Sequence, residues 1–227
     1  MINTIGNSKP LIVEELDLES LSVEDLLSQR ENDFINTEDL NVFYSYPEGG
    51  WGALDEKDGE NALFSIVGNC KNMPAEALEL TLPIRLLKYE LRQDTGGAGR
   101  QRGGLGTHRD YEILSNFASL SFVADRCIYG ANGLEGGKEG GVGAYLINRG
   151  NGAELASPKF ISKGTQILLQ KGDIVSQCTA GGGGYGKPQD RNIDDIKNDL
   201  RLGYISRKEA INTYGMETLN TNNPETS

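Results

Sequence analysis

The 227-residue chain contains a single histidine, His108, and only three cysteines, Cys70, Cys127 and Cys178. One histidine cannot build a His-based metal site within this chain, so we assign no metal ligands. Any Ser–His or Cys–His pair for nucleophilic catalysis would have to use His108. The cysteines are far apart and include no C-x-x-C pair, which supports neither a zinc finger nor a disulfide framework. Buried, reduced thiols in a cytosolic protein are the expected outcome.

Positive charge and long apolar runs are also scarce. The chain has 22 Lys and Arg against 33 Asp and Glu, a formal net charge of −11. Such an acidic chain is a poor binder of nucleic acid and of anionic membranes, so we expect neither as a partner. No apolar run is long enough to span a bilayer. The first ten residues, MINTIGNSKP, lack the apolar region of a signal peptide. These features predict a cytoplasmic protein.

Glycine, by contrast, is abundant: the chain has 30 glycines, and 22 of them lie between residues 96 and 186. Short apolar runs of strand-like length and alternation stand between the glycine clusters. This spacing predicts a mainly β fold, a glycine-rich β-sandwich or partial barrel, with α+β content overall. We expect turns at Lys163-Gly164 and at Lys171–Asp173, whereas Ala75–Leu80 is either a helical turn or the approach to a strand. The expected strands are Ala62–Val67, Pro83–Leu91, Thr107–Leu114, Ala118–Ala124, Gly143–Ile147, Gln166–Leu169 and Ile174–Thr179.

The two ends of the chain differ from this glycine-rich centre. The N-terminal region is acidic, and Ser22 is a suitable N-cap for a short helix. Near the C-terminus apolar residues recur at helical spacing before Gly203, and Ser206 opens a capping box with Glu209. These patterns predict a short C-terminal helical hairpin. We therefore divide the chain into an N-terminal acidic, partly helical arm (1–42), a glycine-rich β domain (43–190), C-terminal helices (191–215) and a disordered tail (216–227).

The glycine run GGGGYG at 181–186 matches the G-x-G-x-x-G pattern of dinucleotide-binding loops and, with Lys187, nearly matches a Walker loop. A Walker loop needs a Ser or Thr hydroxyl at the next position, where this chain has Pro188. A dinucleotide-binding fold needs a βαβ unit, and no strand follows the next helix. We therefore interpret the run as a packing corner or as a loop inserted near a partner's active site. The loop candidates are Gly181, Gly182, Gly183 and Gly184.

Residues 96–109 form a basic segment, with three arginines, His108 and no acidic residue. Glycine-flanked arginines could grip a carboxylate or phosphate through paired N–H groups. Alternatively, they tie glycine turns to carbonyl groups and to Asp94. RNA binding is disfavoured because there is one Arg-Gly-Gly unit and no interleaved aromatic residue. The histidine is either structural or catalytic, and no catalytic residue is assigned. The candidates for substrate or anion binding are Arg100, Arg102, His108 and Arg109, and the candidate loop glycines are Gly96, Gly97 and Gly99.

Several short motifs follow one another in a specific order. The first are GGWGA at 49–53, KDG at 57–59, NMPAEALE at 72–79, PIR at 83–85, YELR at 89–92 and the segment 94–106. The later ones are DR at 125–126, GLEGG at 133–137, KF at 159–160, KGD at 171–173 and the run at 181–186. Together they resemble the C-terminal part of the hydantoinase B/oxoprolinase family, over about residues 43–215. That family includes N-methylhydantoinase, ATP-dependent 5-oxoprolinase and subunits of acetone and acetophenone carboxylases.

This resemblance implies a subunit of an ATP-dependent complex that hydrolyses cyclic amides such as hydantoins or 5-oxoproline. In that family a hydantoinase A-type partner handles ATP and phosphorylates the amide or ketone oxygen. The family's metal site, with His and Asp ligands, lies in an N-terminal part that has no counterpart here.

The chain is therefore expected to bind no cofactor and to be inactive alone, with ATP and a divalent metal on partner chains. The implied partners are a hydantoinase A-like ATPase subunit and a chain that supplies the N-terminal hydantoinase B part. Two alternatives stay open: a subunit of an acetone/acetophenone-type ketone carboxylase, and a non-catalytic scaffold subunit.

Overall fold

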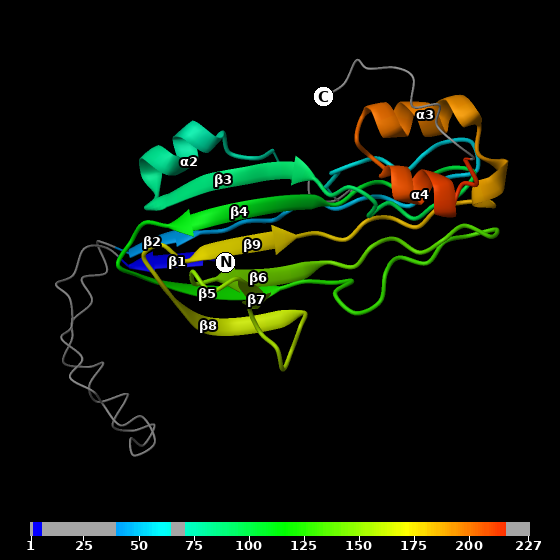
Figure 1. Cartoon of the computed structure of the whole chain (residues 1–227). Coiled ribbons are helices and arrows are strands. Elements are labelled where there is room, and N and C mark those ends of the chain that lie inside the picture. Colours follow the sequence, from blue (N-terminus) through cyan, green and yellow to red (C-terminus); the bar gives the residue numbers. More distant parts are fainter. Residues whose placement is uncertain (1, 6–39, 65–70, 217–227) are drawn as a thin grey trace, which may run out of the picture.

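Two antiparallel sheets form most of the fold (Figure 1). The computed structural model describes residues 2–5, 40–64 and 71–216. One sheet has the strand order β2-β1-β5-β8 and the other β3-β4-β9-β6-β7. The expectation of a mainly β protein with few helices is confirmed. The strands are β1 (Ile2–Ile5), β2 (Leu40–Phe43), β3 (Ile84–Leu91), β4 (Thr107–Ile113), β5 (Phe117–Val123), β6 (Ala144–Asn148), β7 (Ala153–Leu155), β8 (Lys163–Gln170) and β9 (Ile174–Cys178), and the helices are α2 (Ala75–Thr81), η2 (Pro188–Asp190), α3 (Ile193–Arg201) and α4 (Arg207–Asn212).

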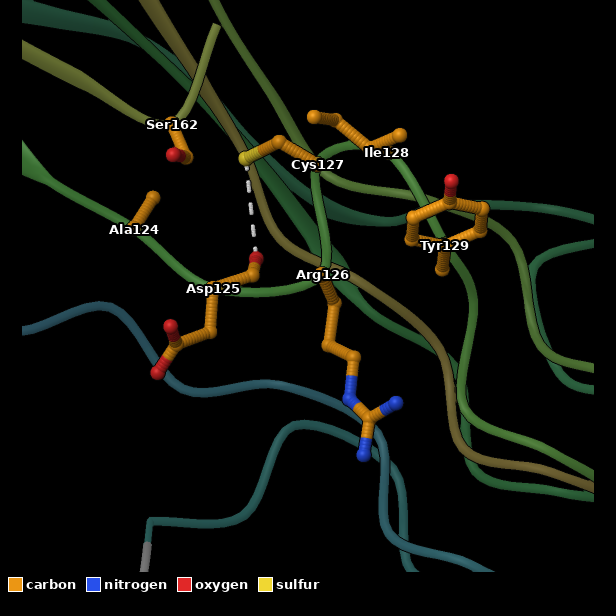
Figure 2. Close-up of a pocket in the computed structure, with 7 residues that line it drawn as sticks. All are labelled: Ala124, Asp125, Arg126, Cys127, Ile128, Tyr129 and Ser162. Atoms are coloured by element: carbon orange, nitrogen blue, oxygen red, sulfur yellow. Dashed lines mark hydrogen bonds between the residues drawn. The ribbon is translucent and has the colours of Figure 1, made fainter.

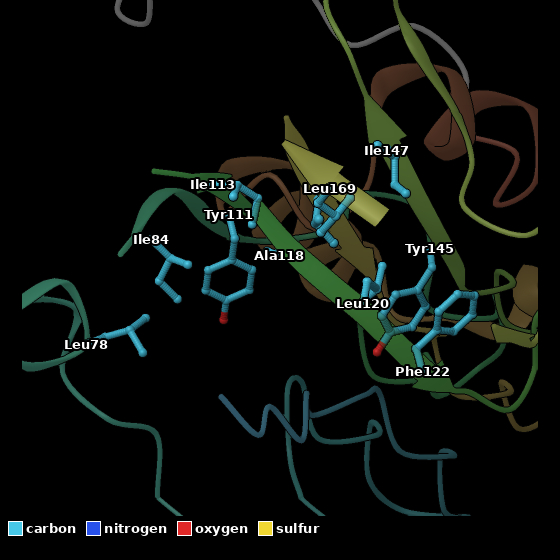
Figure 3. Packing of buried hydrophobic residues seen from close by; sticks show 11 residues of the cluster. Leu78, Ile84, Tyr111, Ile113, Ala118, Leu120, Phe122, Tyr145, Ile147 and Leu169 are labelled. Carbon is cyan, nitrogen blue, oxygen red and sulfur yellow. The ribbon is translucent and has the colours of Figure 1, made fainter. Parts of the chain in front are cut away.

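A single hydrophobic cluster joins the two sheets into a sandwich (Figure 3). Along β4 every second side chain is buried, so that Tyr111 and Ile113 face inward, as strand geometry requires. From the other sheet β5 contributes Leu120 and Phe122. The Phe122 ring stacks on Tyr145 of β6, with ring centroids 4.3 Å apart. Because these residues come from both sheets, burying them holds the sandwich closed.

The expected turn at Lys163-Gly164 is wrong, because both residues belong to β8. Gly164 pairs with Phe122 of β5, and Lys163 pairs with Val123. A Cβ at Gly164 would lie 2.7 Å from the Phe122 ring, so the glycine leaves room for a large buried neighbour inside the strand. The other expected corner is confirmed: Gly172 has φ +91° between β8 and β9.

For three further segments, the structure decides between the expected alternatives or differs from the expected strand. Ala75–Leu80 lies in a helix, α2. Of the expected strand Ala62–Val67, Leu63 forms an isolated bridge with Gly49, and the residues from 65 onward lie outside the described ranges. Strand β7 was not expected, because its three residues are too few to show alternation.

Both ends of the segment interpreted as an N-terminal arm are strands of the first sheet. β1 pairs with β2 on one side and with β5 on the other. The helix expected after Ser22, the thiol of Cys70 and the expected tail beyond residue 216 lie outside the described residues. The division of the chain into four regions stays a prediction.

Beyond the strand ends, extended segments continue toward α3 and α4 (Figure 1). We call the segments 49–61, 94–106, 130–143 and 180–186 the glycine layers. They are joined by backbone hydrogen bonds: Gly97 donates to Gly182, Gly182 to Gly104, and Gly104 to Trp51, at 2.8, 2.9 and 2.8 Å. Side chains are therefore not the main means of packing in this half of the molecule.

Two short helices close the end of the glycine layers, where the sequence predicts a helical hairpin. The Asn192 side chain accepts a hydrogen bond from the Asp194 N–H and begins α3, and Ser206 accepts one from Glu209 and begins α4. Apolar residues of this end pack against Ala98 of the layers. Across the part of the chain that the structure describes, no helix is both long and apolar enough to cross a membrane.

The packing of the glycine layers predicts a large effect for Gly182→Ala. The added Cβ would lie far inside van der Waals contact with the Trp51 carbonyl, so two backbone segments must separate. We expect a loss of about 3 kcal/mol or more in the free energy of unfolding, measured by urea denaturation. Gly52→Ala is the matched control, because the nearest atom to its added Cβ, the Gly183 oxygen, is 3.9 Å away. Equal stability of the two variants would contradict this account.

Candidate functional site

The two sets of candidate loop glycines lie together within the glycine layers. The N–H groups of Gly97, Gly181 and Gly184 all donate to backbone carbonyls, at 2.8 to 2.9 Å. These N–H groups are therefore not free to cradle a phosphate. A Cβ at any candidate would press on neighbouring backbone, so the geometry matches the packing interpretation of these residues. The set comprises Gly96, Gly97, Gly99, Gly181, Gly182, Gly183 and Gly184.

Arg102 lies buried beneath α3, with a side chain only 3% exposed. Its guanidinium donates to the Asp199 carboxylate at 3.4 Å and lies over the Tyr204 ring, 5.1 Å from the centroid. It also donates to Asn61 at 3.4 Å. In this position Arg102 ties the layers to the C-terminal helices. It donates to the Gly103 carbonyl, but its carboxylate partner is Asp199 and not the Asp94 of the structural alternative.

A second buried arginine, Arg191, completes this ion network. It donates to both oxygens of Asp58, at 2.8 and 2.7 Å, and to Asp199 at 2.7 Å. Asp58 also accepts from the Arg102 N–H at 2.7 Å. The network therefore joins the loop after Trp51, the basic segment and α3. Sequence analysis named Asp58 only within the motif KDG at 57–59 and made no assignment for Arg191 or Asp199, because no local pattern marks long-range ion pairs.

The network shifts the pKa values of its two carboxylates in opposite directions. Burial alone would raise the pKa of Asp58, but its hydrogen bonds and charge interaction with Arg191 outweigh burial and hold it below its usual value. At Asp199 burial prevails over Arg102 and Arg191, and the pKa is raised. Because the folded-state pKa of Asp58 is lowered, its stabilisation is present above about pH 4. It is lost as the pH falls through the folded-state pKa.

Arg100 differs from Arg102 in being partly exposed. Its side chain pairs with Asp55 and lies over the Tyr185 ring, 5.9 Å from the centroid. It is 39% exposed, so its guanidinium remains accessible to a partner or ligand. The two glycine-flanked arginines that are candidates for anion binding thus lie in different surroundings, Arg102 buried and Arg100 partly exposed.

Arg109 is buried on the inner face of β4, where the hydrophobic core gives way to the glycine layers. Its guanidinium pairs with Glu48 and donates to Asn72 and Tyr89, at 3.2 and 3.1 Å. The Tyr89 hydroxyl in turn donates to the Glu48 carboxylate. This buried pair fastens the segment before Gly49 onto the second sheet, and sequence analysis did not identify Glu48 as its partner.

His108 lies on the outer face of β4. Its Nε2 is 2.8 Å from Asp110, and its Nδ1 is 3.7 Å from Glu90. The Ser176 hydroxyl donates to Asp110 at 2.5 Å rather than to the imidazole. Cys178 is the cross-strand neighbour of His108, but burial raises the pKa of its thiol and disfavours the reactive thiolate. Among the described residues, no hydroxyl or thiol that could act as a nucleophile is hydrogen-bonded to the imidazole.

The sequence analysis assigned no metal ligands, and the arrangement of possible ligands in the described part of the structure gives no metal site either. Among the described residues, no group of three or more His, Cys, Asp and Glu side chains could hold a metal ion. These residues do not fit the three or four protein ligands of a typical zinc centre.

An open pocket of about 450 Å³ adjoins the end of β5 (Figure 2). Its polar groups include Asp125 and Arg126, a dipeptide of the family-like motifs, and Ser162. The Cys127 thiol donates to the Asp125 carbonyl at 3.5 Å, and burial is the main cause that raises its pKa. Sequence analysis did not name this loop as a site; its one available signal was the Asp125-Arg126 motif.

Comparisons with known proteins agree with the order of the motifs. A model described as hydantoinase B/oxoprolinase matches residues 23–188. An uncharacterized protein of Methanocaldococcus jannaschii is 38% identical over 179 residues, covering 78% of this chain and 31% of that protein. A putative D-/L-hydantoinase component of the B type, from Pseudomonas sp., is 32% identical over 175 residues, covering 77% and 29%.

A solved structure shares the fold. The ATP-dependent caprolactamase from Pseudomonas jessenii superposes with a TM-score of 0.62 and 29% identity, over 74% of this chain and 29% of that chain. The chain spans about a third of the length of the curated relatives described above.

The buried ion network predicts a marked loss of stability for Arg191→Met. The variant keeps an unbranched side chain in place of the aliphatic part of the arginine but leaves Asp199 and Asp58 without their shared partner. We expect a loss of about 3 kcal/mol in the free energy of unfolding at pH 7, measured by urea denaturation. The difference from the unaltered protein should narrow below about pH 4, as Asp58 becomes protonated.

Arg201→Met on the same helix is the control, because Arg201 is exposed and donates only to Asn198, one turn away. We expect a change within about 0.5 kcal/mol for this variant. If the two variants lost the same stability, the network would not be what anchors α3.

Proposed function

Because the chain belongs to the hydantoinase B/oxoprolinase family, we propose that it is the C-terminal hydantoinase B part of an ATP-dependent complex that hydrolyses cyclic amides. The supporting observation is the extent of the match. Residues 23–188 include all four glycine layers and every strand except β1, so the likeness concerns most of the architecture rather than one loop. Hydantoins and caprolactam, named in two relatives, are both cyclic amides.

The proposal places ATP and a divalent metal on partner chains. These are a hydantoinase A-like ATPase subunit and a polypeptide that supplies the remaining part of hydantoinase B. The contribution of this chain is a rigid body: backbone contacts fix the glycine layers, and the buried Arg102 and Arg191 lock the C-terminal helices onto them. The partly exposed Arg100 is available to bind an anionic group at a shared site.

Reconstitution tests this function. The chain is co-expressed with the two partner polypeptides, and opening of hydantoin, 5-oxoproline and caprolactam is measured with and without ATP. We expect ATP-dependent ring opening by the assembled complex and none by the isolated chain.

Three outcomes would contradict the proposal. The first is ring opening by the chain alone, and the second is undiminished ring opening by the partners without it. The third is bicarbonate-dependent carboxylation of acetone in place of ring opening, which would identify a ketone carboxylase.

Arg100→Ala separates a role at the site from a role in assembly. Because Arg100 is exposed and its pairing with Asp55 is at the surface, the variant should fold and assemble normally. We expect turnover to fall about 100-fold if the guanidinium binds a charged group in the reaction. Arg85→Ala is the control, since Arg85 is also an exposed arginine paired with a carboxylate, Glu112. Normal turnover of Arg100→Ala, or loss of assembly, would instead favour a purely scaffolding role.

A further inference from the structure

The loop that follows β5 exposes an unusual amount of apolar surface. We call residues 123–129 the β5 exit loop. Within it Val123 is 85% exposed, Ile128 61% and Tyr129 79%. Single exposed apolar residues are ordinary on a protein surface, but three in one short loop mark a contact surface. Residues 123–129 and Ser162 all lie within the described ranges.

The exit loop is held in one conformation. Arg126 adopts φ +57°, a left-handed conformation that is uncommon for residues other than glycine. Backbone bonds fix both sides of it: the Ala124 N–H donates to Ser162 at 2.7 Å, and the Gly143 N–H donates to Arg126 at 2.9 Å. The Arg126 side chain is tied to the Gly130 carbonyl at 3.1 Å. A loop held in this way loses little conformational entropy when a partner binds.

The exit loop also has a place for a side chain of a partner to enter. Its residues and Ser162 line the open pocket of about 450 Å³. Figure 2 shows that the Arg126 side chain points away from Ala124 and Ser162. Ile128 and Tyr129 also line the pocket, and apolar anchors around a cavity are common in binding surfaces.

The size of the chain indicates what covers this surface. The relatives described above carry the matched segment together with roughly twice as much additional polypeptide in one chain. Contacts between two parts of one chain can be as apolar as a permanent interface. When the additional part is a separate polypeptide, the corresponding surface on this chain is left exposed, and the exit loop has that character.

We propose that the β5 exit loop is the docking surface for the polypeptide that supplies the remaining part of hydantoinase B. Ile128 and Tyr129 are its apolar anchors, and a side chain of that polypeptide enters the adjoining pocket. This inference rests on the proposed function, because it takes its partner from there.

The test measures binding of the full chain to the co-expressed remaining hydantoinase B polypeptide. We expect Ile128→Glu and Tyr129→Glu each to raise the dissociation constant by about 30-fold. Leu80→Glu is the matched control, because Leu80 is 87% exposed but lies on α2 beside the other sheet, and its dissociation constant should be unchanged. Thermal unfolding of each variant should match that of the unaltered chain, since all three side chains are exposed.

Amide hydrogen exchange of the unaltered chain, measured with and without the partner polypeptide, tests the same surface without substitutions. Amides of residues 123–130 should exchange more slowly in the complex, while those of α2 should not change. Tight binding by both exit-loop variants with normal ring opening would overturn this inference and leave the proposed function intact. Failure of the unaltered chain to bind the polypeptide would overturn both. Equal weakening by Leu80→Glu would also overturn it, because the effect would then not belong to the exit loop.

Discussion

The glycine layers depend on one constraint, the close approach of backbone segments to one another. In the glycine layers, peptide groups of one segment lie directly against those of the next, and a single methyl group at Gly182 has no space. The hydrogen bonds between segments satisfy buried N–H and C=O groups that water cannot reach. The abundance of glycine is therefore explained by close backbone packing and not by a need for flexibility. Glycine is required at these positions because a side chain would not fit.

Glycine-rich segments offer few apolar side chains for packing against the rest of the molecule, although Ala98 does pack against the C-terminal helices. Buried arginines add to this packing, because their long side chains reach from one element to another. Arg102 and Arg191 connect the layers to α3 through Asp58 and Asp199, and Arg109 fastens the preceding segment to β4 through Glu48. Such pairs are costly to break, since the remaining charge is buried without a partner. Most of the arginines that suggest an anion site are thus part of the framework.

These two kinds of internal contact, backbone packing and buried ion pairs, bear on the proposed function. The glycine layers and the buried arginines make internal contacts, so few of their polar groups are left to bind a ligand. Arg100 and the exit loop beside β5 are exposed features with specific geometry. Both face outward, where the partner polypeptides of an ATP-dependent complex would lie. Under the proposed function, the chain is a preformed surface on which a larger active assembly is built.

Some features of this protein could be derived from the sequence because they depend on neighbouring residues. Alternation predicted most strands, capping residues predicted the helical hairpin, and the order of short motifs identified the family. Others depended on contacts between distant residues. Arg100 and Arg102 are two positions apart in a Gly-rich segment, yet one is exposed and the other buried, because the tertiary fold places Asp199 beside only one of them. The sequence Lys163-Gly164 is typical of a turn, but both residues belong to a strand. The reason for the glycine is the ring of Phe122, which only the folded sandwich brings against it. Local patterns record how the backbone is arranged along the chain, whereas the role of each charged group is decided by which distant partner the fold brings to it.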